Sequence, residues 1–149
     1  VTVPLNVMYR KHELRYMIND SQASFVVVSE ENLQYILEVR SELKSVRRII
    51  TISEKAPEGC DSFRKLIEQE DGKRPNRENA ADDLAIICYT SGTTGVSKGA
   101  MLTHANFLSN INTLAEIWEL READRLLMAL PMFHIHGLGI GFGQDDDPV

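Results

Sequence analysis

Short apolar runs alternate with amphipathic stretches along the first half of the chain. Apolar residues at helical spacing predict three helices, over residues 12–18, 30–43 and 62–69. Runs rich in β-branched residues predict extended segments over residues 2–5, 25–28 and 46–52. A turn is expected at residues 57–59, and the polar stretch 70–83, with its glycine, proline and asparagine, predicts a loop or linker.

The second half continues the alternation. An apolar run over 84–89 predicts a strand that is buried on both faces, and the Gly/Ser/Thr-rich segment 90–99 predicts a turn after it. Thr103 is expected to be the N-cap of a helix that extends to about residue 120. The buried stripe of that helix is expected to consist of Phe107, Ile111, Leu114 and Trp118. A further strand over 125–130 is then followed by a loop.

Strands that alternate with helices predict an α/β fold, in which a parallel sheet is covered by helices on both faces. The chain of 149 residues is long enough for one core and short for two full domains. We expect a single domain over residues 1–143. Residues 144–149 carry no core-forming pattern, and we expect them to form a disordered or non-native acidic tail. Because the chain opens on Val1 rather than methionine, we also expect it to be a fragment of a longer protein.

Composition and charge mainly exclude classes of function. Charged residues make up 26% of the chain and hydrophobic residues 43%, which is typical of a globular domain. The net charge of −6 disfavours a nucleic-acid partner, and the longest apolar stretch, 126–133, is far too short to be a transmembrane segment. Cys60 and Cys88 form no CxxC pair, so neither a disulfide framework nor a zinc site is indicated, and a cytoplasmic location is expected.

The candidate chemistry lies in residues 89–99, which read Tyr-Thr-Ser-Gly-Thr-Thr-Gly-Val-Ser-Lys-Gly. This segment follows a predicted strand, and open α/β sheets bind ligands at the carboxyl ends of their strands. Its glycines allow close backbone approach, its amide groups can form an anion-binding concavity, and its hydroxyls add donors. Lys98 supplies a positive charge. Together these features favour a polyphosphate site over the alternative of a flexible connector.

A Walker A loop does not fit the same residues. When Lys98 is aligned with the motif lysine, Gly92 matches the first glycine. Ser97 then replaces the second glycine, and Gly99 replaces the hydroxyl residue that would bind magnesium. A phosphate-binding NTPase is therefore retained only as a third hypothesis.

Residues 89–99 resemble the phosphate-binding signature of the AMP-forming acyl-CoA synthetase (adenylate-forming ligase) superfamily, in particular its fatty-acid and aryl-CoA ligases. Further similar segments are found at residues 3–6, 100–107 and 130–138. The resemblance covers about 2–143. One departure is Ser97, where the family usually has a proline; serine retains the N–H donor and leaves the backbone less restricted.

This resemblance implies that the chain is an incomplete part of the large N-terminal domain of such a ligase. The implied reaction is ATP-dependent activation of a carboxylic acid, of the fatty-acid kind, to an acyl-adenylate. The thiol of coenzyme A then displaces AMP, with Mg²⁺ as the implied metal cofactor. The implied partner is a small-molecule acid, no oligomeric state is predicted, and the isolated fragment is expected to be inactive.

The resemblance also assigns site residues. It places the phosphates of ATP at Thr90, Ser91, Gly92, Thr93, Thr94, Gly95 and Lys98. Lys98 and His134 are the expected catalytic residues, and the acid is expected to contact His134, His136 and Gly137. An imidazole can orient a carboxylate or a phosphate by a hydrogen bond. No metal ligand is assigned, since a site at the two histidines would lack an evident third ligand.

Two alternatives to this assignment stay open. Each histidine can be a structural residue near a strand end, and the whole chain can be a non-catalytic remnant or phosphate-binding module that lacks the rest of an active site. Within the ligase hypothesis, the sequence leaves aliphatic, aromatic and dicarboxylic acids, malonate among them, as possible substrates.

Overall fold

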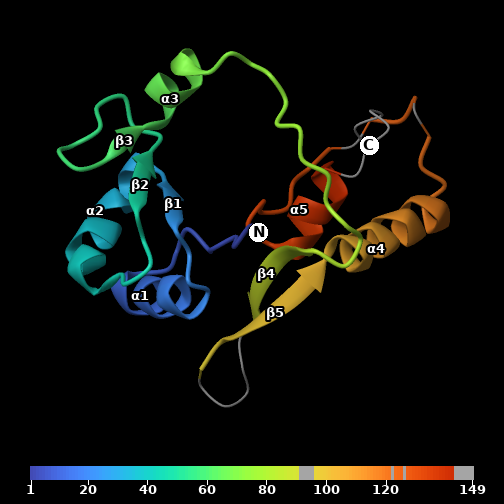
Figure 1. Ribbon diagram of the computed structural model, residues 1–149. Helices are drawn as coiled ribbons and strands as arrows, with labels where there is room; N and C mark the ends of the chain where they lie inside the picture. The colour runs from blue at the N-terminus through green and yellow to red at the C-terminus, as the bar shows by residue number, and fades with distance from the viewer. Residues whose placement is uncertain (91–95, 122, 126, 143–149) are drawn as a thin grey trace. The chain divides into compact units, whose positions relative to one another are not determined.

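The computed structural model describes residues 1–90, 96–121, 123–125 and 127–142 (Figure 1). The chain divides into two compact units. The N-terminal unit comprises Val7–Glu78, and the C-terminal unit comprises Val1–Asn6 together with Asn79–Val149. Each unit contains its own sheet, where the sequence analysis expected a single one.

The N-terminal unit is built on a parallel sheet of three strands in the order β1-β2-β3. Its strands are β1 (Phe25–Val28), β2 (Arg48–Thr51) and β3 (Asp61–Ser62). Its helices are α1 (Lys11–Asp20), α2 (Glu30–Val39), the 3₁₀ helix η1 (Arg40–Glu42) and α3 (Phe63–Gln69). The predicted alternation of helices with parallel strands is confirmed here, although the helix expected over 30–43 changes to 3₁₀ geometry after Val39.

The core of this unit lies between the helices and one face of the sheet. Val28 and Ile49 are buried on that face, and the helices contribute buried residues at helical spacing, namely Leu14, Met17, Ile18, Leu33, Ile36 and Val39. On the opposite face, Phe25 and Val27 expose 56% and 55% of their surface. Among the described residues, helices therefore cover one face of this sheet and leave the other exposed.

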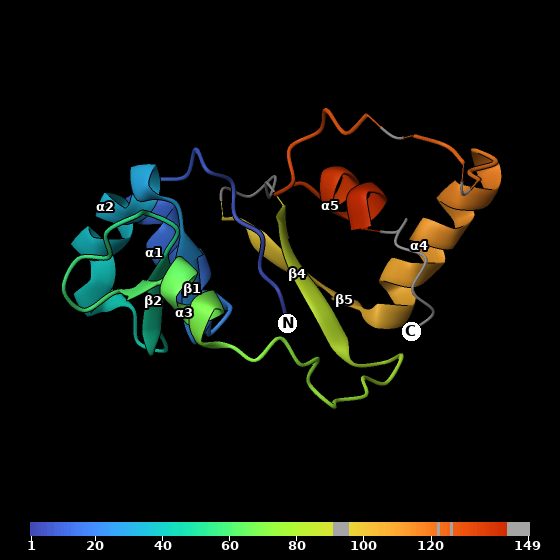
Figure 2. The ribbon, with the colours of Figure 1, turned by 90° about the horizontal axis from the view of Figure 1, so that it is seen from above.

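The C-terminal unit contains an antiparallel hairpin, which Figure 2 shows leading into a long helix. The hairpin consists of β4 (Leu84–Thr90) and β5 (Lys98–Thr103), and α4 (His104–Ile117) follows directly. Thr2 adds an isolated parallel bridge to Ile86. The sequence analysis missed β5 and expected β4 to be buried on both faces, whereas only Ile86 of β4 is buried.

Helix α4 begins as predicted. The Thr103 hydroxyl oxygen accepts a hydrogen bond from the Asn106 amide, and the Asn106 side chain accepts one from the Thr103 amide, which completes a capping box. Phe107, Ile111 and Leu114 are half-buried, as a helix stripe requires. Trp118 is a correction: it is 48% exposed, because the helix ends at Ile117 and Trp118 leaves the stripe.

The segment after α4 also differs from expectation. Residues 125 and 127–130 form no strand, and Leu127 is 91% exposed. The glycine-rich stretch that follows forms helix α5 (Ile135–Phe142) instead of a loop. The predicted acidic tail, 144–149, lies outside the described residues, so its boundary stays a prediction. Within the described part of the chain, no helix is long and apolar enough to cross a membrane.

Candidate functional site

The hairpin brings the two ends of the candidate phosphate loop together. Thr90 is the last residue of β4, and it pairs with Lys98, the first residue of β5. The Thr90 hydroxyl also donates a hydrogen bond to the main-chain carbonyl oxygen of Lys98, at 3.5 Å. Both residues are exposed, and among the described residues the Lys98 ammonium makes no ion pair. Thr90 and Lys98 thus lie directly opposite each other, and the Lys98 ammonium is available to a ligand.

The other predicted phosphate ligands are Ser91, Gly92, Thr93, Thr94 and Gly95, and all five lie outside the described residues. Their assignment stays a prediction.

Gly99 has a structural role that the sequence analysis did not identify. It pairs with Tyr89 across the hairpin. A Cβ atom at this position would lie 2.8 Å from Cγ2 of Ile87 and 3.3 Å from Cζ of Tyr89. The last glycine of the signature therefore allows Ile87 and Tyr89 to pack against the backbone of β5. A bulky strand residue opposite a glycine could have revealed this role of Gly99. Recognising that signal requires knowledge of the hairpin register.

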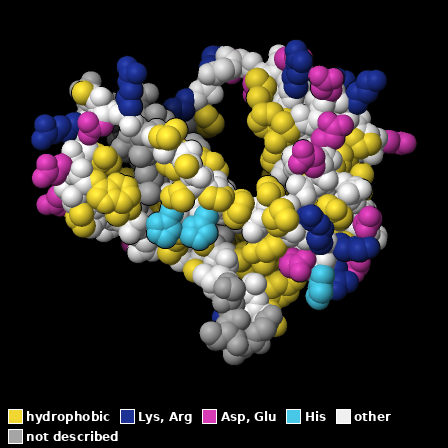
Figure 3. Space-filling model, turned by 180° about the vertical axis from the view of Figure 1, so that it is seen from behind, with side chains coloured by type: hydrophobic (Ala, Val, Ile, Leu, Met, Phe, Trp, Pro, Cys, Tyr) yellow, Lys and Arg dark blue, Asp and Glu magenta, His cyan; other side chains and the backbone are white. Residues whose placement is uncertain are grey.

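The predicted acid-binding residues gather at the beginning of α5. The rings of His134 and His136 are stacked, with centroids 5.2 Å apart and an angle of 14° between their planes. Their Nδ1 atoms lie 3.3 Å apart. Both side chains are exposed, and Figure 3 shows two neighbouring histidines surrounded largely by hydrophobic side chains.

Gly137 is buried and lies against the segment that precedes the helix. A Cβ atom there would overlap the carbonyl oxygen of Pro131 and lie 3.1 Å from that of Leu130. The absence of a side chain is therefore required for packing at this position. Contact of Gly137 with the acid stays a prediction.

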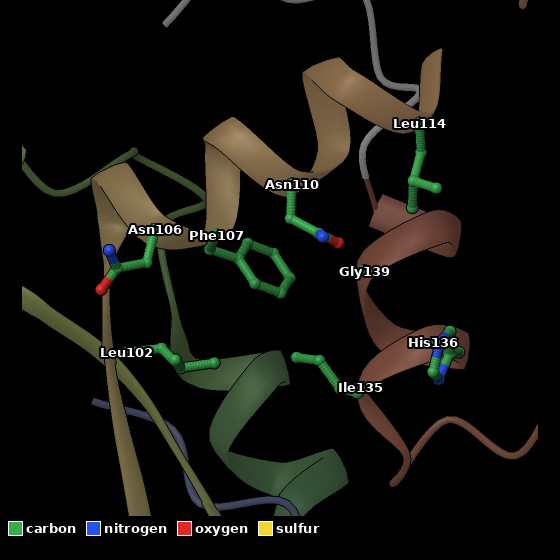
Figure 4. A pocket seen from close by; sticks show the side chains of 8 residues that line it. All are labelled: Leu102, Asn106, Phe107, Asn110, Leu114, Ile135, His136 and Gly139. Atoms are coloured by element: carbon green, nitrogen blue, oxygen red, sulfur yellow. The ribbon is translucent and has the colours of Figure 1, made fainter. Parts of the chain in front are cut away.

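A pocket of about 360 Å³ opens between β5, α4 and α5. Figure 4 shows its lining, in which the side chains of Asn110 and Leu114 point from α4 towards α5. The lining residues are Leu102, Asn106, Phe107, Asn110, Leu114, Ile135, His136 and Gly139. The pocket is mainly apolar, and its size is at the lower end of the range for small-molecule sites. The sequence analysis identified Phe107 and Leu114 as part of a buried helix stripe. It did not predict a pocket, because nothing in the sequence placed α5 opposite α4.

The candidate phosphate-binding residues and the candidate acid-binding residues are held in place by different elements. The hairpin register joins Thr90 to Lys98, and the start of α5 joins His134 to His136. No hydrogen bond or ion pair links the two groups within the residues that the structure describes. In the same residues, no cluster of three or more His, Cys, Asp or Glu side chains could hold a metal ion.

A comparison with protein families matches residues 1–143 to a family model described as "AMP-binding enzyme". Among curated proteins, the malonate–CoA ligase of Arabidopsis thaliana is 35% identical over 143 residues, covering 93% of this chain and 22% of that protein. The chain spans 22% to 27% of the length of the first curated relatives that it matches.

Solved structures give the same result. A long-chain-fatty-acid–CoA ligase from Archaeoglobus fulgidus superimposes with a TM-score of 0.81 at 31% identity, over 95% of this chain and 28% of that one. The apo form of MatB from Rhodopseudomonas palustris superimposes with a TM-score of 0.79 at 36% identity, over 95% of this chain and 27% of that one. These matches confirm the α/β fold class.

Proposed function

Because the chain belongs to the family of AMP-binding enzymes, we propose that the intact protein activates a carboxylic acid with ATP and transfers it to coenzyme A. In the first step, a carboxylate oxygen of the acid attacks the α-phosphorus of ATP, and pyrophosphate leaves. In the second step, the sulfur of coenzyme A attacks the acyl carbonyl carbon, and AMP leaves. The products are an acyl-CoA thioester, AMP and pyrophosphate.

The observation that carries this proposal is the pairing of Thr90 with Lys98 at the root of the signature. It places Thr90 directly across from Lys98, and Lys98 is exposed and without an ion-pair partner among the described residues. Backbone amides and hydroxyls of residues 90–95 would hold the β- and γ-phosphates, and Lys98 would neutralise the charge that develops on pyrophosphate. Preorganised donors of this kind contribute strongly to nucleotidyl transfer, because most of the catalysis is positioning and charge stabilisation.

The pocket beside His136 supports an acid with an apolar body as the substrate. Its lining is aliphatic and aromatic apart from His136, Asn106, Asn110 and Gly139, and apolar surface favours the burial of an acyl chain. We therefore include a fatty-acid type of substrate in the proposal, with His134, His136 and Gly137 beside the reacting end.

Mg²⁺ and location complete the proposal. Mg²⁺ bound to ATP would neutralise phosphate charge, but the described residues supply no cluster of ligands for it, so we assign it no residue. A cytoplasmic location is proposed because Cys60 and Cys88 are both free thiols.

Pyrophosphate exchange tests the assignment of Lys98. In the intact protein, Lys98→Ala should lower acid-dependent exchange between pyrophosphate and ATP on the order of 10²-fold, since one preorganised charge is removed. Lys65→Ala is the matched control, because Lys65 is also exposed but lies on α3 of the other unit. Unchanged exchange in Lys98→Ala would refute the role of Lys98. Absence of any exchange in the unmodified protein, across acids of several types, would favour the non-catalytic alternative.

A further inference from the structure

The stacked histidines at the start of α5 form a hydrogen-bonded pair whose geometry fixes where their protons lie. The main-chain nitrogen of His136 is 3.5 Å from Nδ1 of His134, with the N–H directed at it. A backbone N–H can only donate. Nδ1 of His134 is therefore an acceptor in this arrangement.

The tautomer of His134 follows from this contact. A neutral imidazole has one nitrogen that donates and one that accepts, so the proton of His134 is on Nε2. Nδ1 of His136 also lies 3.3 Å from Nδ1 of His134. Because two unprotonated nitrogens at this distance would direct lone pairs at each other, Nδ1 of His136 carries a proton and donates it. Nδ1 of His134 thus accepts hydrogen bonds from both the main-chain N–H and the ring N–H of His136.

The backbone around His134 is held on both sides. Its amide donates to the carbonyl oxygen of Pro131 at 3.0 Å, and its carbonyl oxygen accepts from the amide of Leu138 at 2.9 Å. The His136 ring, stacked at 5.2 Å, limits rotation of the His134 ring. Among the described residues, no hydrogen bond is made by Nε2 of His134, so this N–H is available to a ligand.

We propose that His136 is a positioning residue that fixes His134 in its Nε2–H tautomer, so that His134 donates a hydrogen bond to an oxygen of the reacting acid or its adenylate. This inference rests on the proposed function, because it takes the ligand of His134 to be that acid. The hydrogen-bond partner of one ring nitrogen determines whether the other ring nitrogen carries the proton. By donating to Nδ1 of His134, His136 therefore keeps the proton of His134 on Nε2. In this role His136 acts through His134.

Nitrogen NMR of the intact protein, labelled with ¹⁵N-histidine, tests the tautomer directly. The His134 signals are assigned by their loss in His134→Asn. We expect Nε2 of His134 to be protonated and Nδ1 to be unprotonated. In His136→Leu the ring donor is lost and only the longer contact from the main-chain N–H of residue 136 remains, so the fraction of His134 in the Nε2–H tautomer should fall. In His136→Asn the amide group replaces the Nδ1–H donor, and the single tautomer should be restored. His12→Asn, on α1, is the control and should change nothing at His134.

Acid-dependent pyrophosphate exchange tests the consequence in the same proteins. His136→Leu should lower kcat about ten- to a hundredfold, with little change in the KM for ATP, and His136→Asn should recover most of the loss. A proton on Nδ1 of His134 in the unmodified protein, or a tautomer that His136→Leu leaves unchanged, overturns the pairing. The tautomer can instead respond as expected while the His136→Leu and His134→Ala variants catalyse pyrophosphate exchange at the normal rate. That result overturns the role of His134 in the proposed function.

Discussion

At the scale of single residues, the glycines of α5 differ in how closely other parts of the chain approach them. Gly137 leaves no room for a side chain beside Pro131, whereas a Cβ atom at Gly139 would lie 3.6 Å from the ring of Phe107, an ordinary contact distance. Two glycines of one helix thus have different structural requirements. The sequence analysis predicted a loop here, because glycine disfavours helices and its contacts with distant residues have no signature in the local pattern.

Substitution by alanine separates these two glycines. Gly137→Ala should lower the free energy of unfolding by about 1–3 kcal/mol, because the new methyl group would overlap the Pro131 carbonyl. Gly139→Ala should be neutral or stabilising by up to about 1 kcal/mol, since it gains helix propensity without a clash. Urea denaturation followed by circular dichroism measures both, and equal stability of the two variants would contradict the close approach at Gly137.

At the scale of elements, caps and register place the signature between a hairpin and a helix. The sequence predicted the start of α4 correctly, because Thr103 has a local role that needs only its neighbours, such as Asn106. It did not predict β5, whose Lys98, Gly99 and Ala100 have little strand character and extend because β4 supplies hydrogen bonds. The same limit applies to residues 127–130, which are apolar but pair with no strand in the described structure.

The cap of α4 can be tested with two threonines of the same helix region. Thr103→Ala should cost about 1 kcal/mol of stability, because the Asn106 amide loses its side-chain acceptor. Thr113→Ala is the control: its hydroxyl donates to the Ser109 carbonyl oxygen, which the helix already engages, so little change is expected. Thermal or chemical unfolding compares the two, and the capping box is refuted by a Thr103→Ala variant as stable as the parent.

For the molecule as a whole, α/β class and family could be predicted, and the arrangement of the site could not. The class follows from the alternation of strands and helices, and the family from residues 89–99. The division into two units with separate sheets depends on pairing between distant segments, such as Thr2 with Ile86. The same is true of the pocket wall at Asn110, which lies opposite α5 only after folding.

Burial on the two faces of the N-terminal sheet predicts opposite sensitivities. Ile49 is 1% exposed, and Ile49→Ala should cost about 2–5 kcal/mol because it leaves a cavity in the core. Val27, on the neighbouring strand, lies on the exposed face, and Val27→Ala should change stability by about 0.5 kcal/mol or less. Denaturant midpoints of the two variants provide the comparison, and similar losses would show that both faces are covered in solution.

The antiparallel ladder of β4 and β5 limits how the signature can vary in length. Thr90 faces Lys98 across the ladder, and side chains alternate between the two sides of a strand. Insertion or deletion of one residue within β5 would turn the Lys98 ammonium to the opposite side of the hairpin, even with every signature residue present. Exchange of an outward side chain such as Met101, which is 67% exposed, leaves that geometry intact. Spacing along β5 is therefore under stronger constraint than the identity of its outward-facing residues.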